Sequence, residues 1–184
     1  MRLGFFSCSI VVLGTFALGC DEPLPPTPQG AFLVNFVDPG IDCPHMSHKS
    51  VMGTVSQTAR TTVAVDGVQG AEVACSVIGP DLGSVKIDAT LKIGGTEILT
   101  FNVASIDSKA TEAMPAKGNV GFSSVTTGDF FSSDQPCDFY IEPGGEAVKP
   151  GAAWVSFKCP SMVESTNICA LAESYVLIEN CAQQ

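Results

Sequence analysis

The stretch Val85-Lys-Ile-Asp-Ala-Thr-Leu-Lys-Ile93 places apolar side chains at every odd position and polar side chains at every even one. An alternation with a period of two residues is typical of a β-strand that buries one face and exposes the other. Gly94 and Gly95 follow, and the alternation then resumes from Leu99 to Val103. Two glycines between alternating runs predict a hairpin, because a type I′ turn needs positive φ at both central residues.

Further short runs on both sides of this hairpin predict more strands. They cover residues 31–37, 51–57, 61–65, 73–77, 119–126, 136–142, 152–159 and 174–181. Asp66-Gly67 is a second turn signal, which leads from 61–65 into 73–77. About nine or ten strands predict an all-β fold, an antiparallel β-sandwich or barrel-like jelly roll. Residues 106–117 and 160–172 are expected to form irregular loops or a short helix.

The first nineteen residues have the layout of a secretory signal peptide. Arg2 precedes an apolar run from Leu3 to Leu18, and the small residue Gly19 follows. A spanning helix needs about 20 predominantly apolar residues, and no basic flank follows this run. We therefore expect residues 1–19 to be removed.

Ala17-Leu18-Gly19-Cys20 resembles the lipobox of bacterial lipoproteins, with alanine where that family usually has leucine. The resemblance implies that Cys20 becomes the first mature residue and carries acyl chains such as palmitate. Residues 20–30 are rich in proline, which favours an extended tether of about 3.1 Å per residue. Residues 31–184 then form one domain. We expect the protein at the bacterial cell envelope, anchored to the inner or outer membrane and facing the periplasm or the exterior.

The chain is acidic, with 19 Asp and Glu residues against 9 Lys and Arg residues and a formal net charge of −10. Its bases are scattered and form no basic run. Polyanions attract positively charged surfaces, so nucleic acid is an unsuitable partner. The expected partners are instead the membrane, through the lipid, and an envelope protein or polysaccharide.

Six cysteines remain once Cys8 in the signal and Cys20 are set aside. They are Cys43, Cys75, Cys137, Cys159, Cys169 and Cys181. An even set in an exported chain predicts three disulfides. Zinc is a weaker interpretation, because these six contain no Cys-x-x-Cys spacing.

The pairing stays open between two alternatives. If the strands that carry Cys137 and Cys159 form a hairpin, one register places these two cysteines opposite each other. Cys169 and Cys181 then reach back to the two N-terminal cysteines. In the alternative, Cys159 pairs with Cys169 across a short loop. The first register also sets three further pairs opposite each other: Phe139 and Phe157, Ile141 and Val155, and Asp138 and Lys158.

Common catalytic motifs are absent, so no cofactor and no enzymatic activity are expected. A possible metal site is the cluster of imidazoles and thioethers in His45, Met46, His48 and Met52. These donors suit copper, although Lys49 places a positive charge among them. The competing interpretation is an exposed polar loop held by the Cys43 disulfide.

A possible ligand surface follows from the alternation in 136–142 and 152–159. If these strands pair, Tyr140 and Trp154 share the outer face with three charged residues: Asp138, Glu142 and Lys158. Aromatic rings cover the apolar faces of sugars and polar groups bind the hydroxyls, so this face predicts a carbohydrate-binding module. The competing interpretation is that Trp154 packs under a loop.

The C-terminal pattern Gly151-Ala-Ala-Trp-Val-Ser-Phe-Lys-Cys-Pro160, then Cys169, then Tyr175-Val-Leu-Ile-Glu-Asn-Cys181 resembles the ending of uncharacterised lipoproteins numerous in myxobacteria. Val73-Ala-Cys75-Ser76 and Pro136-Cys137 fit the same layout. A looser likeness is to small mycobacterial surface lipoproteins. The resemblance implies a disulfide-bonded β fold on a membrane surface and no known activity. We therefore expect a lipid-anchored envelope protein with a non-catalytic binding or structural domain.

Overall fold

The computed structural model describes residues 25–40, 43–55, 62–141 and 148–183. Within these ranges the chain is all-β, with eleven strands and no helix, as the alternating pattern predicts. The strands are β1 (Gln29–Val37), β2 (Lys49–Met52), β3 (Ala64–Val65), β4 (Ala71–Ile78), β5 (Val85–Ile93), β6 (Glu97–Ile106), β7 (Ala116–Ser123), β8 (Phe131–Ser133), β9 (Cys137–Tyr140), β10 (Ala153–Glu164) and β11 (Asn167–Glu179).

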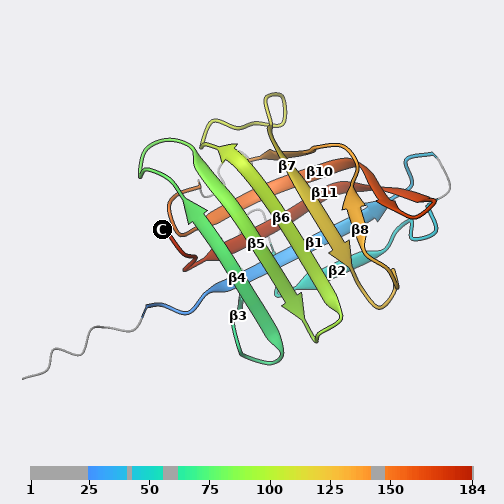
Figure 1. The fold of residues 1–184 in the computed structure, drawn as a ribbon, viewed down its shortest axis with the longest axis horizontal. Helices are drawn as coiled ribbons and strands as arrows, with labels where there is room; N and C mark the ends of the chain where they lie inside the picture. The colour runs from blue at the N-terminus through green and yellow to red at the C-terminus, as the bar shows by residue number, and fades with distance from the viewer. Residues whose placement is uncertain (1–24, 41–42, 56–61, 142–147, 184) are drawn as a thin grey trace, which may run out of the picture.

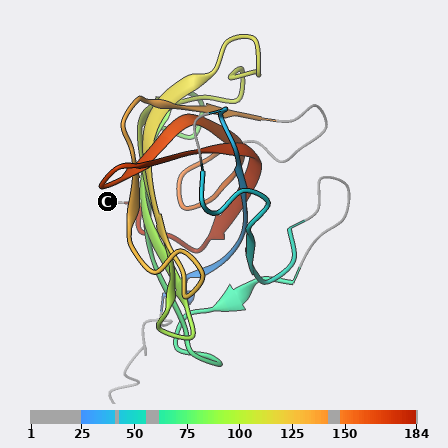
Figure 2. The same cartoon turned by 90° about the vertical axis from the view of Figure 1, so that its right-hand side faces the viewer.

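These strands form one antiparallel sheet in the order β2-β1-β11-β10-β8-β7-β6-β5-β4. Two strands lie off this path, because β3 pairs with β1 and β9 lies between β7 and β10. The sheet folds over itself, so that β4 to β7 lie in front of β1, β10 and β11 and cross them steeply (Figure 1). In the turned view, the green and yellow strands form one side of the molecule (Figure 2).

The hydrophobic core lies between the two layers. The odd residues of β5 point inward, and Ile87 and Leu91 are fully buried. Phe32 of the other layer belongs to the same core cluster. Phe139 and Phe157 stack within it, with ring centroids 5.4 Å apart. The even residues of β5 therefore face outward, away from the second layer.

The predicted hairpin between β5 and β6 is present. Ile93 lies opposite Glu97, and the glycines of the turn have φ values of 61° at Gly94 and 73° at Gly95. The second turn signal also adopts positive φ, at Gly67. The strand before this turn, β3, does not form a hairpin across it, because β3 pairs with β1 and forms no ladder with β4.

The expectation of irregular structure at 160–172 is wrong. There β10 continues to Glu164, the chain turns at Ser165 with a φ of 50°, and β11 begins at Asn167. The register between β10 and β11 shifts between Cys159 and Met162, on either side of Pro160. A bulge accommodates a proline that has no amide hydrogen to donate, so the strand continues past it.

Three disulfides cross-link the domain. They connect Cys43 to Cys169, Cys75 to Cys181, and Cys137 to Cys159. In the ladder of β9 with β10, Phe139 lies opposite Phe157 and Asp138 opposite Lys158. The first of the two proposed pairings is thus confirmed, and the pairing of Cys159 with Cys169 is wrong.

The disulfides also indicate where the domain resides. Structural disulfides form and persist in oxidising compartments, so three of them indicate an extracytoplasmic location. In the described part of the chain, no helix has the length and hydropathy required to span a bilayer.

Candidate functional site

The predicted aromatic face on β9 and β10 is not exposed. Tyr140 points away from the core, yet only 1% of its surface is accessible, and Trp154 is half-buried. Ser156, opposite Tyr140 in the ladder, is also buried. The prediction of Tyr140 as an exposed ligand contact is therefore wrong. Glu142 lies outside the described residues.

The charges on this face form ion pairs with one another. Lys117 binds Asp138, and Lys158 donates to Glu112 from the segment between β6 and β7. The bond to Glu112 raises the pKa of Lys158 above its ordinary value. The Lys158 ammonium also lies over the Tyr140 ring, 5.5 Å from its centroid, and burial raises the pKa of the Tyr140 hydroxyl.

The four candidate copper ligands lie in different surroundings. Met52 is buried in the core, whereas Met46 is exposed. The His45 ring packs edge-on against Phe131, and His48 packs against aromatic rings of the core edge. Within the described ranges, no three His, Cys, Asp or Glu side chains are grouped to hold a metal ion.

His48 does make one contact that the sequence did not predict. Its Nε2 lies 3.1 Å from the Ser124 hydroxyl oxygen, a geometry found in nucleophilic hydrolases. Ser124, however, is only 4% exposed, and its Oγ accepts the Thr127 amide hydrogen at 3.1 Å. The pair fastens the loop before β2 to the loop after β7. We interpret it as structural.

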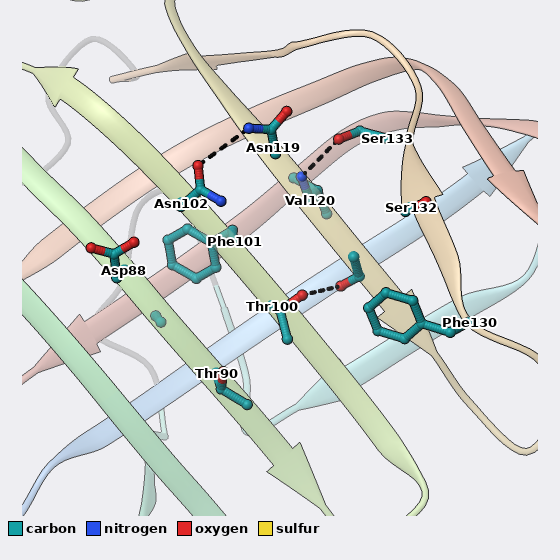
Figure 3. Close-up of a pocket in the computed structure, with 12 residues that line it drawn as sticks. Asp88, Thr90, Thr100, Phe101, Asn102, Asn119, Val120, Phe130, Ser132 and Ser133 are labelled. Carbon is teal, nitrogen blue, oxygen red and sulfur yellow. Dashed lines mark hydrogen bonds between the residues drawn. The ribbon is translucent and has the colours of Figure 1, made fainter.

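A hollow of about 410 Å³ lies on the outer face of the sheet over β5 to β8, hereafter the β5–β8 hollow (Figure 3). The ladder aligns two rows of outward residues across these strands. The first row is Asp88, Asn102 and Asn119, and the second is Thr90, Thr100, Gly121 and Ser132. Because the register places these residues side by side, polar groups from four strands line one surface.

An aromatic ring closes one side of the β5–β8 hollow. Phe130, in the loop before β8, is 48% exposed, which is unusual for so large an apolar side chain. It lies against Gly121: a Cβ built on that glycine would be 2.3 Å from the ring. The absent side chain at Gly121 thus makes room for the ring to lie on the sheet.

The polar groups of the hollow are mostly uncharged. The Asn119 amide donates to the Asn102 oxygen at 3.3 Å, and the Thr100 hydroxyl donates to the Gly121 carbonyl at 3.4 Å. Among the residues that line the hollow, Asp88 is the one ionisable group, and it pairs with Lys86 at 2.7 Å. The surface therefore offers amide and hydroxyl groups with little net charge.

A second, larger groove of about 930 Å³ follows the proline tether. The tether is fixed there, because Asn180 donates to the Thr27 carbonyl and Gln29 donates to Glu179. Its walls are largely prolines and the C-terminal residues 179–183. This groove is formed by the tether itself, so we do not assign it a ligand.

Sequence reasoning did not identify the β5–β8 hollow. The alternation in β5 and β6 places Asp88 and Asn102 on the outer face, and this pattern can be read from the sequence. Nothing in the sequence showed that β7 and β8 continue the same face, or that Phe130 folds back onto Gly121. Comparison with protein families, curated proteins and solved structures finds no match to this chain.

Proposed function

We propose that this protein is a lipid-anchored envelope protein whose β domain binds a partner without catalysing a reaction. The observation that carries the proposal is an open, mostly uncharged polar hollow on a sheet that three disulfides cross-link. A rigid surface loses little conformational entropy on binding, so a preformed hollow favours recognition. The partner is an envelope protein or polysaccharide.

The tether supports the anchoring part of this proposal. β1 begins at Gln29, and Thr27 is already held by Asn180. Only a short segment then separates the sheet from Cys20, the proposed site of acylation. At about 3.1 Å per residue, this segment keeps the domain within about 30 Å of the bilayer.

The side-chain contacts support a role in binding. Ser124 and His48 fasten two loops together, and Ser124 lies too deep to meet a substrate. The acids next to the lysines of β7 and β10 are held in ion pairs. No nucleophile with an adjacent base lines the β5–β8 hollow among the described residues.

The anchoring is tested by intact mass of protein extracted from membranes, before and after reduction and alkylation. We expect a chain that begins at Cys20, carries acyl mass and gains six alkyl groups only after reduction. The variant Cys20→Ala should leave the membrane fraction, whereas Cys8→Ala, the matched control, should not. An unmodified Cys20 in the membrane-extracted protein would contradict the anchor.

The binding role is tested by photo-cross-linking in intact cells. A photoreactive residue at Ser132 lies in the hollow, and one at Ser165, in the β10–β11 turn, serves as the control. We expect an adduct at Ser132 that is missing at Ser165, with either a protein or a polysaccharide. Equal labelling at both positions would contradict a partner at the β5–β8 hollow.

A further inference from the structure

We propose that the β5–β8 hollow binds a neutral glycan chain, with Phe130 as the stacking platform and the Asn102–Asn119 pair as the principal hydrogen-bonding group. This inference rests on the proposed function, because it names the chemical class of the partner at the same surface. The carbohydrate site that the sequence predicted at Tyr140 and Trp154 is thus proposed at a different part of the outer surface of the sheet.

The Phe130 ring has the properties of a sugar platform. A pyranose ring has an apolar face of C–H groups, which packs against an aromatic ring, and hydroxyls at its edge. Nearly half of the Phe130 surface is exposed, and the ring is supported by the backbone at Gly121. A ring held in place before binding loses little entropy when the sugar arrives.

The amide pair supplies hydrogen bonds in both directions. Since the Asn119 nitrogen donates to the Asn102 oxygen, the Asn102 nitrogen and the Asn119 oxygen still have capacity to bond. Both side chains are exposed. One amide can then donate to a sugar hydroxyl while the other accepts from its neighbour. The hydroxyls of Thr90 and Ser132 extend the same polar surface.

The low charge of the hollow favours a neutral polymer over a polyanion as its ligand. Nucleic acids and acidic polysaccharides require basic groups, and no lysine or arginine lines the hollow among the described residues. A peptide partner would require a larger apolar centre than one phenylalanine provides. A neutral glycan needs hydroxyl and amide partners together with an aromatic face.

The dimensions suit a chain of several sugars. Neighbouring strands lie about 4.8 Å apart, so four strands make a surface roughly 15 Å across. The hollow is open to solvent, and Asp88, its one charged lining residue, is already paired with Lys86. We therefore expect longer oligosaccharides to bind more tightly than their disaccharides, because more units contact the two rows.

The test uses the full chain, extracted in detergent and labelled with ¹⁵N. The probes are soluble neutral oligosaccharides of glucose, N-acetylglucosamine, mannose and xylose, from disaccharide to hexasaccharide. We expect a hexasaccharide of at least one type to shift the side-chain amide signals of Asn102 and Asn119 and the backbone amide of Gly121. The Trp154 indole signal, on a different part of the sheet, should not move.

Variants assign the contacts. Phe130→Ala should weaken the Kd about tenfold, the effect of losing one aromatic contact of about 1.4 kcal/mol. Asn102→Ala should weaken it by a similar factor. Val125→Ala removes another exposed apolar side chain, 73% accessible, from the same loop and should change the Kd by less than twofold.

The outcomes separate this inference from the proposed function. If no oligosaccharide shifts the amide signals of the hollow, the proposal that it binds a neutral glycan is wrong. If Ser132 still cross-links a protein in cells, the anchored binding role stands without it. If the shifted signals lie around Trp154, or if Phe130→Ala leaves the Kd unchanged, the glycan does not bind at the β5–β8 hollow. If neither glycan shifts nor cross-links are seen, both the glycan proposal and the proposed binding role are wrong.

Discussion

The outer face of β5–β8 and the outer face of β9–β10 belong to the same sheet but differ in what covers them. Over β9 and β10, Tyr140 is buried beneath Lys158, which is itself held by Glu112. Over β5 to β8, Asn102 and Phe130 are open to solvent. The charged side chains of the first face pair with one another, whereas the second face is mostly uncharged and its exposed amides have bonding capacity left.

This difference shows that the direction of a side chain and its availability are separate properties. Strand periodicity decides which side of the sheet a residue occupies. The connecting segments then decide whether that side is open. The segment between β6 and β7 contacts the chain just after β9, where the Ile141 amide donates to the Ala110 carbonyl. Stability should therefore depend more on the covered face, and binding on the open face.

The largest expected effect concerns the Cys75–Cys181 disulfide, which joins β4 beside the open face to the end of β11. Its ends are 106 residues apart, whereas those of Cys137–Cys159, under the covered face, are 22 apart. Replacing both cysteines by alanine should cost about 5 kcal/mol for the long loop and about 3 kcal/mol for the short one. Urea unfolding measures both free energies. A larger loss at Cys137–Cys159 would contradict the loop-length argument.

The next effect compares one aromatic residue from each face. Tyr140→Ala should lower the free energy of unfolding by about 3–5 kcal/mol, because it leaves a cavity under Lys158. Phe130→Ala should lower it by less than about 1 kcal/mol, because the ring is half-exposed. Thermal and urea unfolding give both values. Equal losses would show that the two faces are equally covered.

A pH effect should come from His48, which packs against Phe36 and Phe122 of the core and so belongs to neither outer face. Burial lowers the pKa of His48 below its ordinary value of about 6.5, although the nearby Glu97 carboxylate opposes this. The unfolded chain then binds the proton more readily, so stability is fully present above about pH 6.5 and falls as the pH drops towards the folded pKa. His48→Gln should flatten this slope in urea titrations. An unchanged slope would contradict the assignment.

The smallest effect concerns the ion pair of the covered face. Glu112→Gln removes the partner of Lys158, but Glu112 is largely exposed and Lys158 partly so, and the loss of stability should stay below about 1 kcal/mol. It should shrink further in high salt. Asp107→Asn, in the same segment, is a control of equal charge change. A loss as large as that of Tyr140→Ala would mean that the pair alone holds the segment closed.

Much of the fold was predictable, because period-two alternation is a local signal. It marked the strand at 85–93 and its glycine turn, and it placed Cys137 opposite Cys159 in one of the two disulfide pairings considered. The length of β10 and β11 was not predictable. Pro160 is a local signal for a break, whereas the bulge that accommodates it depends on the neighbouring strand.

The site was harder to predict than the fold for the same reason. The sequence places Asp88 and Tyr140 equally on outer faces. Their exposure depends on contacts between segments far apart in the chain, such as Glu112 with Lys158. Likewise, one side of the hollow depends on how the loop before β8 folds, because this fold brings Phe130 onto Gly121 of β7. Such contacts have no signature within a short window of sequence.

The position of β11 has a consequence for biosynthesis. The final strand lies between β1 and β10, and Ala182 pairs with the edge of β4. The first strand therefore has no inner neighbour until the C-terminal residues have been made and delivered. Long-range strand pairing is slow, so the layer that contains β1 is completed last. This order of assembly suits a protein that must cross a membrane as an extended thread and fold, with its disulfides, on the far side.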